Sequence, residues 1–266
     1  MKAIIKIKKN NYEVDFSKGN DISIPMIFNG EQPNTYNVNK AVSKPYKDGN
    51  FIGDTRKGGP CNFETYTLTP HCNGTHTECI GHITKERISI LNSLKKELFA
   101  STLISIIPEN SKENYYPILN ENDKIISKKI LEEKLTEIKP EFLEGLIIRT
   151  LPNKVKKKNR NYIENPPCFL SIDAMEYIVQ LGVQHLLVDI PSVDRLFDDG
   201  ILSSHNIFWK TKEKKFNEET INKTITEMIF VPNKISDGTY ITNLQCAPFD
   251  SDASPSRPIL YKIHGI

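Results

Sequence analysis

Alternating apolar and polar residues predict strands along much of the chain. Residues 3–7 and 12–16 alternate in this way, and Lys9-Asn10-Asn11 between them has the composition of a turn, which predicts a hairpin. Residues 63–68 alternate with a period of two and predict a strand. Runs rich in β-branched and other apolar residues predict further strands at 101–107, 145–150, 183–190, 224–231, 239–244 and 258–263.

Helical spacing of apolar residues predicts three helices. In residues 123–138, charged positions separate the apolar ones, and Pro140 follows the end of the pattern. Ser171 has the residue type of an N-cap and Gly182 that of a C-cap, which predicts a helix through Leu181. Residues 84–98 carry apolar side chains close to helical spacing and predict the third helix.

Strands and helices are mixed along the chain, without a change of composition that marks a linker and without an internal repeat. This pattern predicts a single α/β domain over residues 1–266. Residues 21–59 are rich in Asn, Gly, Pro and Lys, so we expect a long ordered loop there. Loops of this length in a compact domain often belong to a functional site. The loop's aromatic residues are therefore candidates to line a substrate pocket: Phe28, Tyr36, Tyr46 and Phe51.

Composition narrows the function classes without naming one. The chain has 266 residues, of which 38% are apolar and 26% charged, and this is ordinary for a soluble protein. A net charge of +2 gives no reason to expect a nucleic acid partner, and the short basic run at 154–160 is typical of a solvated loop. No segment has the ~18 to 20 apolar residues of a membrane span, and the first residues lack the features of a signal peptide. Five scattered cysteines argue against a disulfide framework, so we expect a cytoplasmic protein.

The candidate chemistry is concentrated in residues 69–83. Three of the six histidines and two of the five cysteines of the chain fall in this segment, together with one carboxylate. These side chains are His71, Cys72, His76, Glu78, Cys79 and His82. Imidazole, thiolate and carboxylate groups are ligands of transition metals, and small residues between them let the backbone bend around an ion.

Spacing alone leaves several arrangements open. An open catalytic site could use Cys72, His76 and Glu78 as ligands, with His82 beside the metal to move protons. Cys72, His76, Cys79 and His82 could instead enclose a structural zinc ion, although their spacing is tighter than in ordinary zinc modules. Cys72 or Cys79 could also be a nucleophile activated by a histidine. A histidine-rich turn without a metal is the remaining alternative.

A resemblance favours the open site. Gly74-Thr75-His76-Thr77-Glu78 followed by His82 resembles the signature His-x-Gly-Thr-His-x-Asp-x-Pro-x-His of the metal-dependent cyclase family, which includes bacterial kynurenine formamidase and isatin hydrolase. Other segments of the family are matched in the same order, so that the resemblance covers roughly residues 20–263. These segments are Asp21-Ile-Ser-Ile-Pro25, Leu146-Ile-Ile-Arg-Thr150, Asp189-Ile-Pro-Ser-Val-Asp194, a later histidine at His205, and Ser254-Pro-Ser-Arg257.

The resemblance implies a fold, an activity and a set of site residues. The fold would be a single α/β domain with a mixed, partly barrel-like central sheet flanked by helices. The activity would be hydrolysis of an amide, formamide or lactam C–N bond of a small molecule by metal-activated water, in a homodimer or homotetramer. His76 and Glu78 would be metal ligands, His82 would transfer protons, and His205 would belong to a second metal site or lie just behind the first.

The chain departs from the family signature at three positions that matter for the metal. In ungapped register Cys72 occupies the place of the first ligand histidine, whereas a one-residue bulge would put His71 there. Glu78 replaces the ligand aspartate, and Thr242 stands where the resemblance places a second ligand carboxylate. We therefore expect one divalent transition metal, zinc if the thiolate binds, with manganese open for a histidine and carboxylate set. The alternative function is a catalytically degenerate member that binds a small ligand or a partner.

Two other groups have simpler interpretations. His185 lies in an apolar strand, which predicts a core histidine whose polar atoms are satisfied. Ser192 and Asp194 suggest a nucleophile and its orienting acid, but without an adjacent histidine a tight structural turn is the expectation.

Overall fold

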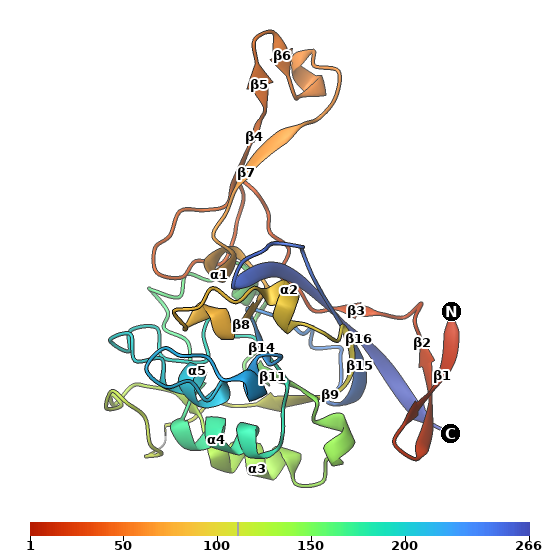
Figure 1. Ribbon diagram of the computed structural model, residues 1–266, viewed down its shortest axis with the longest axis vertical. Helices are drawn as coiled ribbons and strands as arrows, with labels where there is room; N and C mark the ends of the chain where they lie inside the picture. Colours follow the sequence, from red (N-terminus) through yellow and green to blue (C-terminus); the bar gives the residue numbers. More distant parts are fainter. Residues whose placement is uncertain (111) are drawn as a thin grey trace.

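The computed structural model describes residues 1–110 and 112–266, and a sheet that closes on itself forms its centre (Figure 1). The order of its strands is β16-β15-β9-β11-β13-β14-β8, and β8 pairs back with β16. Strands β9, β11, β13 and β14 run parallel, and the other pairs are antiparallel. The seven strands are β8 (His76–Cys79), β9 (Leu98–Ile106), β11 (Gly145–Thr150), β13 (His185–Val188), β14 (Thr224–Glu227), β15 (Gly238–Cys246) and β16 (Ala253–Gly265). The expected α/β fold with a mixed, barrel-like sheet is confirmed.

The two faces of the closed sheet carry separate cores, because successive residues of a strand point to opposite faces. Leu103, Ile147 and Leu187 come from three neighbouring strands and belong to one cluster with Tyr240 and Leu260 from the opposite side of the ring. This cluster therefore fills the interior of the barrel. The next residues along the same strands belong to a second cluster with side chains of the helices: Ile104, Leu146, Ile148, Leu186 and Ile225.

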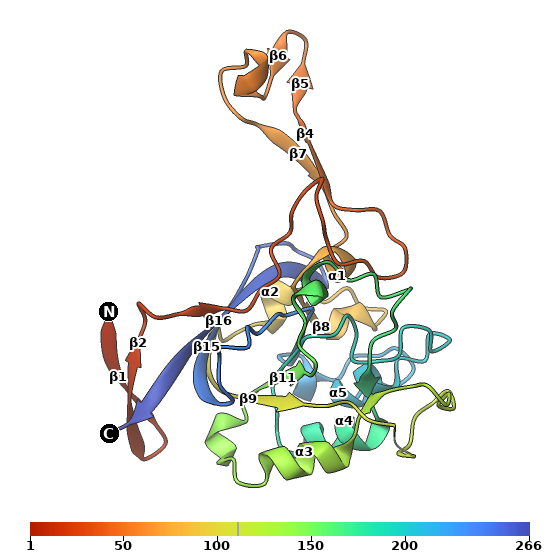
Figure 2. The same ribbon diagram turned by 180° about the vertical axis from the view of Figure 1, so that it is seen from behind.

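Three helices cover the outer face of the parallel strands, as Figures 1 and 2 show. They are α3 (Lys128–Leu135), α4 (Ile172–Gln180) and α5 (Ser203–Phe208). The Ser171 hydroxyl accepts a hydrogen bond from Ala174 N at the start of α4, and Gly182 has φ 79° just after its end, as expected for an N-cap and a C-cap residue. The helices predicted at 123–138 and 171–181 are thus confirmed, with shorter bounds for the first.

The helix predicted at 84–98 is wrong apart from one turn, α2 (Ile90–Ser93). Ile90 is buried, but Leu91 is 43% exposed, and Leu98 already begins β9. The apolar residues of this segment do not form one face of a helix, although their spacing matches that of such a face.

The remaining regular elements lie around the barrel. Strands β1 (Lys2–Ile7) and β2 (Asn10–Asp15) form the predicted hairpin, which continues the sheet next to β16, where β3 (Asn20–Asp21) also pairs. The short elements are α1 (Pro70–Asn73), η2 (Ile80–His82), β10 (Ile125–Ile126), η3 (Pro140–Phe142), η4 (Val155–Asn159), β12 (Phe169–Leu170) and η5 (Glu218–Thr220). None of the helices in the part of the chain that the structure describes is long and apolar enough to cross a bilayer.

The long segment at 21–59 contains more regular structure than expected. Part of it forms an arm, residues 42–67, that projects away from the barrel (Figures 1 and 2). The arm is built from β4 (Val42–Pro45), β5 (Lys47–Asp48), β6 (Phe51–Ile52), η1 (Thr55–Lys57) and β7 (Glu64–Thr67), and β7 is the strand predicted at 63–68. The rings of Tyr46, Phe51 and Phe63 pack on one another within the arm.

Candidate metal centre

Strand β8 places two of the expected ligands on the outer face of the barrel. His76 and Glu78 are two residues apart in a strand, so both point to the same side. In the register of β8 with β14, Glu227 lies opposite His76 and Ile225 opposite Glu78. Because Ile225 belongs to the cluster between sheet and helices, all these side chains face the helices, and the site is not inside the barrel.

Short elements before and after β8 bring two more histidines to this face. His71 comes from α1, whose first turn begins with Pro70, a residue that suits this position because it has no N–H to satisfy. His82 comes from η2, directly after the strand. The turn requires Gly81, since a Cβ atom there would lie 2.1 Å from the carbonyl oxygen of Ile88. Gly81 therefore lets the chain fold back closely enough for His82 to reach the site.

The nitrogen atoms of these histidines surround two carboxylates. One oxygen of Glu78, Oε2, lies 3.7 Å from His71 Nε2 and 3.7 Å from His82 Nε2. On the other side, His76 Nε2 lies 3.5 Å from Glu227 Oε2. His76, Glu78 and Glu227 are all fully or almost fully buried, whereas the side chains of His71 and His82 are 29% and 28% exposed. The centre thus has a closed floor and one side that opens to solvent.

His205 joins the centre from α5. Its Nε2 lies 3.0 Å from Glu78 Oε1, and its Nδ1 lies 2.6 Å from Asp194 Oδ2. Asp194 also accepts hydrogen bonds from the backbone N–H groups of Ser204 and His205 and from the hydroxyl of Tyr115. The turn predicted at Ser192–Asp194 therefore has a further role, which is to hold the imidazole of His205 with Nε2 toward the centre.

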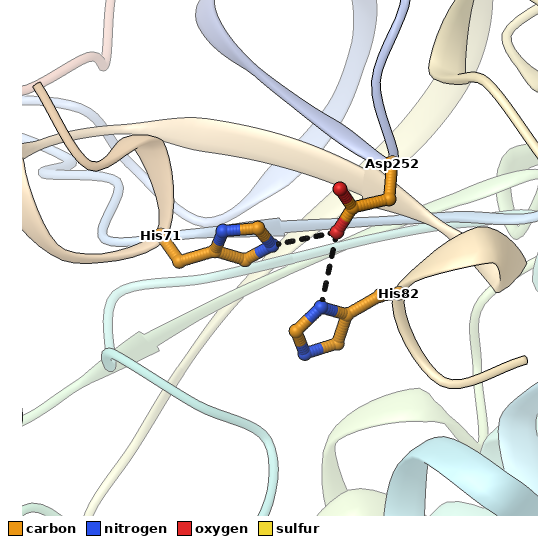
Figure 3. A group of neighbouring side chains, drawn as sticks. All are labelled: His71, His82 and Asp252. Carbon is orange, nitrogen blue, oxygen red and sulfur yellow. Dashed lines mark hydrogen bonds and ion pairs between the residues drawn. The ribbon is translucent and has the colours of Figure 1, made fainter. Parts of the chain in front are cut away.

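Asp252 completes the group from the segment just before β16 (Figure 3). Its Oδ2 lies 3.2 Å from His82 Nδ1 and 3.2 Å from His71 Nε2. Figure 3 shows the carboxylate between the two imidazoles. Asp252 was not predicted as a site residue, because 170 positions separate it from His82.

The charges of the centre influence one another strongly. Burial alone would raise the pKa of Glu78, but His82, His205 and His71 outweigh it and hold this pKa well below its usual range. Burial and the negative charge of Glu78 raise the pKa of Glu227. Burial, reinforced by the positive charge of His71, lowers the pKa of His76 to about 4, which leaves a neutral imidazole whose nitrogen can donate its lone pair to a metal.

Three atoms in the centre are buried without a hydrogen-bond partner: His71 Nε2, His76 Nε2 and Glu78 Oε2. A buried polar atom without a hydrogen-bond partner is costly, and three of them in one cluster of side chains need an explanation. Tetrahedral zinc with bonds of ~2.1 Å separates its ligand atoms by about 3.4 Å. The ligand atoms of His76, Glu78 and Glu227 lie within 4.8 Å of one another, as do those of Glu78, His82 and His205. Residues of this type at these separations fit a divalent ion.

Of the two candidates for the first ligand, His71 is the one whose nitrogen lies near the other potential ligands. His71 reaches the centre, whereas Cys72 is buried next to it in α1 and belongs to none of the groups of potential ligands in the described part of the chain. Burial, with a smaller effect of Glu227, raises the pKa of the Cys72 thiol to about 11, so it stays protonated at neutral pH. The closed arrangement of Cys72, His76, Cys79 and His82 is not formed either, since the thiol of Cys79 donates to the carbonyl of Ile88.

The second carboxylate of the centre is Glu227, and the expectation for Thr242 is wrong. Thr242 lies in β15 on the same face as Tyr240 and Leu244, which point into the barrel, and its hydroxyl is 2.6 Å from that of Ser101. A side chain inside the barrel cannot reach a centre on the outer face. Glu227 was overlooked because the sequence does not reveal that its strand pairs with β8.

Two further expectations have different outcomes. His185 is a satisfied core histidine, as predicted: it is 4% exposed, its Nδ1 lies 2.9 Å from Thr224 Oγ1, and its ring stacks on Phe99.

Among the loop aromatics, Tyr46 and Phe51 lie in the arm and Phe28 packs on Tyr66. Burial, followed by the charges of Glu227 and other acidic groups, raises the pKa of Tyr36, and its ring contacts that of Phe197.

Comparisons with known proteins agree with this geometry. Residues 16–195 match the sequence model of the Cyclase family, described as "Putative cyclase". No curated protein sequence matches the chain. Similar solved structures include a predicted metal-dependent hydrolase from Bacillus stearothermophilus, which is 16% identical with a TM-score of 0.59 over 92% of this chain and 98% of that one.

Two isatin hydrolases are similar in the same way. One is bound to the product analogue thioisatinate and is 12% identical, with a TM-score of 0.61 over 93% of each chain. The other is isatin hydrolase A from Labrenzia aggregata bound to benzyl benzoate, which is 11% identical, with a TM-score of 0.59 over 92% of this chain and 93% of that one. At such identities the likeness establishes a shared fold.

Proposed function

This chain belongs to the Cyclase family, and from that premise we propose that it is a metal-dependent hydrolase of an amide, formamide or lactam C–N bond in a small molecule. The observation that carries the proposal is a group of buried atoms around Glu78 that have no hydrogen-bond partner. Glu78 Oε2 lies 3.7 Å from His71 Nε2, and Glu78 forms one group of potential ligands with His76 and Glu227. The isatin hydrolases among the similar structures support a C–N bond of this class.

His71, His76 and Glu78 would hold the ion. Bound there, a divalent ion supplies Lewis acidity, which lowers the pKa of coordinated water toward ~7 and polarises a carbonyl group. Glu78 has a second oxygen facing His205, and Glu227 lies 3.9 Å from the same nitrogen, so these three residues could hold a second ion. Without a thiolate in the set, zinc and manganese both suit the ligands.

His82 is the residue that moves protons in this proposal. Its Nε2 faces Glu78, and the side chain is reachable from the open side of the centre. Water adds to the carbonyl carbon, and His82 accepts the proton that this water loses. The C–N bond then breaks with its electron pair on nitrogen, and His82 delivers the proton to that nitrogen. The products are a carboxylic acid and an amine, which in a lactam stay joined in one molecule.

Metal content tests the proposal directly. Protein purified without added metal is expected to hold zinc or manganese, measured by mass spectrometry with plasma ionisation. His71→Ala is expected to lose this metal, while Cys72→Ala, its neighbour in the same helical turn, is the matched control and keeps it. If neither variant weakens metal retention, the proposed ligand set is wrong.

A panel of formamides, lactams and other cyclic amides, assayed with zinc and with manganese, tests the reaction. Clearly substoichiometric metal, together with no hydrolysis after either ion is added, would overturn the enzyme proposal in favour of a degenerate binding protein. We also propose that the protein forms a homodimer or homotetramer, and sedimentation of the full chain measures this oligomeric state. A cytoplasmic location is a further proposal.

A further inference from the structure

Asp252 is the acidic residue of the centre to which the proposed ligand set assigns no role. Its backbone is held firmly: its carbonyl accepts from Cys79 N at 3.0 Å, and the preceding carbonyl, of Ser251, accepts from Ile90 N at 2.8 Å. The next residue, Ala253, pairs with Glu78 in the register of β16 with β8. The pairing of β16 with β8, which positions Glu78, therefore also positions the carboxylate of Asp252 beside the centre.

The two imidazoles next to Asp252 relate to it differently. His82 Nδ1 forms a hydrogen bond with Asp252 Oδ2. His71 Nε2 lies equally close to this oxygen, but it makes no hydrogen bond with good geometry. Asp252 thus forms a hydrogen bond with His82 and an ion-pair contact with His71, and Figure 3 draws both.

His71, His82 and Asp252 also have the residue types of a separate metal site, with ligand atoms within 4.8 Å of one another. That site would require the Nε2 lone pair of His71, which the ligand set of His71, His76 and Glu78 already uses. One lone pair cannot bind two ions, so an ion at the outer position would compete with the centre. The geometry is better explained by the hydrogen bond that exists.

We propose that Asp252 is a positioning residue that accepts the N–H of His82 at Nδ1 and so keeps His82 Nε2 unprotonated and directed at Glu78. The inference rests on the proposed function, in which His82 Nε2 accepts a proton. A neutral imidazole carries its proton on one nitrogen only, and the hydrogen bond at the other end selects which. Without Asp252 the ring is free to rotate or to carry its proton on Nε2, where it cannot act as a base.

The test compares Asp252→Ala, Asp252→Asn and the control Asp250→Asn in zinc-loaded full-length protein. Asp250 is exposed and lies in the same segment, so its substitution removes a negative charge near the centre without touching the imidazoles. Long-range ¹H–¹⁵N spectra of histidine-labelled protein report which nitrogen of His82 is protonated, with the His82→Gln spectrum as the assignment reference. This readout does not depend on catalysis.

Asp252→Ala is expected to shift His82 to the Nε2-protonated form, to keep its zinc, and to lower kcat by about 10- to 100-fold with KM unchanged. Asp252→Asn, whose amide oxygen still accepts the Nδ1 proton, is expected to stay within a few-fold of the wild type, as is Asp250→Asn. An unchanged His82 tautomer in Asp252→Ala would overturn the proposal. Loss of zinc in both Asp252 variants would also overturn it, because Asp252 would then be a ligand. If no substrate is hydrolysed at all, the proposed function fails while the tautomer result still decides the role of Asp252.

Discussion

The inner and outer faces of the strand pair β8–β14 carry very different side chains, although residues of the two faces alternate along the same two strands. On the inner face, the hydroxyls of Thr77 and Thr226 lie 2.8 Å apart and satisfy each other. On the outer face, His76, Glu78 and Glu227 are as deeply buried, but they are titratable groups, and His76 Nε2 and Glu78 Oε2 have no hydrogen-bond partner. Satisfied polar groups are compatible with a stable fold, whereas buried polar atoms without partners and two neighbouring buried carboxyl groups destabilise it. The inner face is therefore built for stability and the outer face for binding an ion.

Histidines show the same contrast. His185 points to the inner side, where it contacts a threonine hydroxyl and the ring of Phe99, and burial, with a smaller effect of Lys96, lowers its pKa to about 4. His205 is equally buried on the outer side, but Asp194 and Glu78 outweigh the effect of burial and raise its pKa well above the usual value. The pKa of the same side chain is thus lowered on one face and raised on the other, because of what surrounds it.

Substitutions at adjacent positions of β8 should separate the two faces most sharply. Glu78→Gln is expected to abolish metal retention and to lower hydrolysis by more than about 100-fold, because the amide cannot replace a charged ligand. Thr77→Val, one residue away on the inner face, should keep metal and activity within a few-fold and lower the unfolding free energy by about 1 kcal/mol. Metal analysis, initial rates and urea unfolding measure these effects. Equal loss of activity in both variants would contradict the division between the faces.

Acid should weaken the inner face through His185. Its pKa is about 4 in the folded protein and ~6.5 when unfolded, so its contribution to stability is complete above pH ~6.5 and is lost as the pH falls toward 4. Between about pH 7.5 and about pH 5 the linked loss is roughly 2 kcal/mol. Urea unfolding of the wild type and of His185→Gln at both pH values measures it, since the difference between the two proteins removes the titration of the outer histidines. A difference that does not depend on pH would show that His185 is not held neutral.

Thr242→Val should have the smallest effect. It removes the hydroxyl that bonds Ser101 inside the barrel, so the unfolding free energy should fall by about 1 kcal/mol with metal content unchanged. Altered metal binding in this variant would place Thr242 at the centre after all, and would thereby contradict the assignment of Glu227 as the second carboxylate.

Much of the fold was predictable because local patterns and the folded structure agree. The run of apolar and β-branched residues in 145–150 and the capping residues around α4 were sufficient to place these elements. The segment 84–98 shows the limit of such patterns, because apolar residues spaced like a helix face can also be single anchors on another surface.

For the site, the sequence by itself determined that His76, Glu78 and His82 lie close together, since one short segment holds them and their spacing suits a strand followed by a tight turn. Only the tertiary structure added Glu227 and Asp252, which strand pairing brings from more than a hundred residues away. Only the tertiary structure also shows that His71, rather than Cys72, lies among the potential ligands. Adjacent residues in a helix point about 100° apart, so the orientation of α1 against the barrel decides which of the two faces the centre. That orientation is set by packing, and the spacing of residues along the chain does not reveal it.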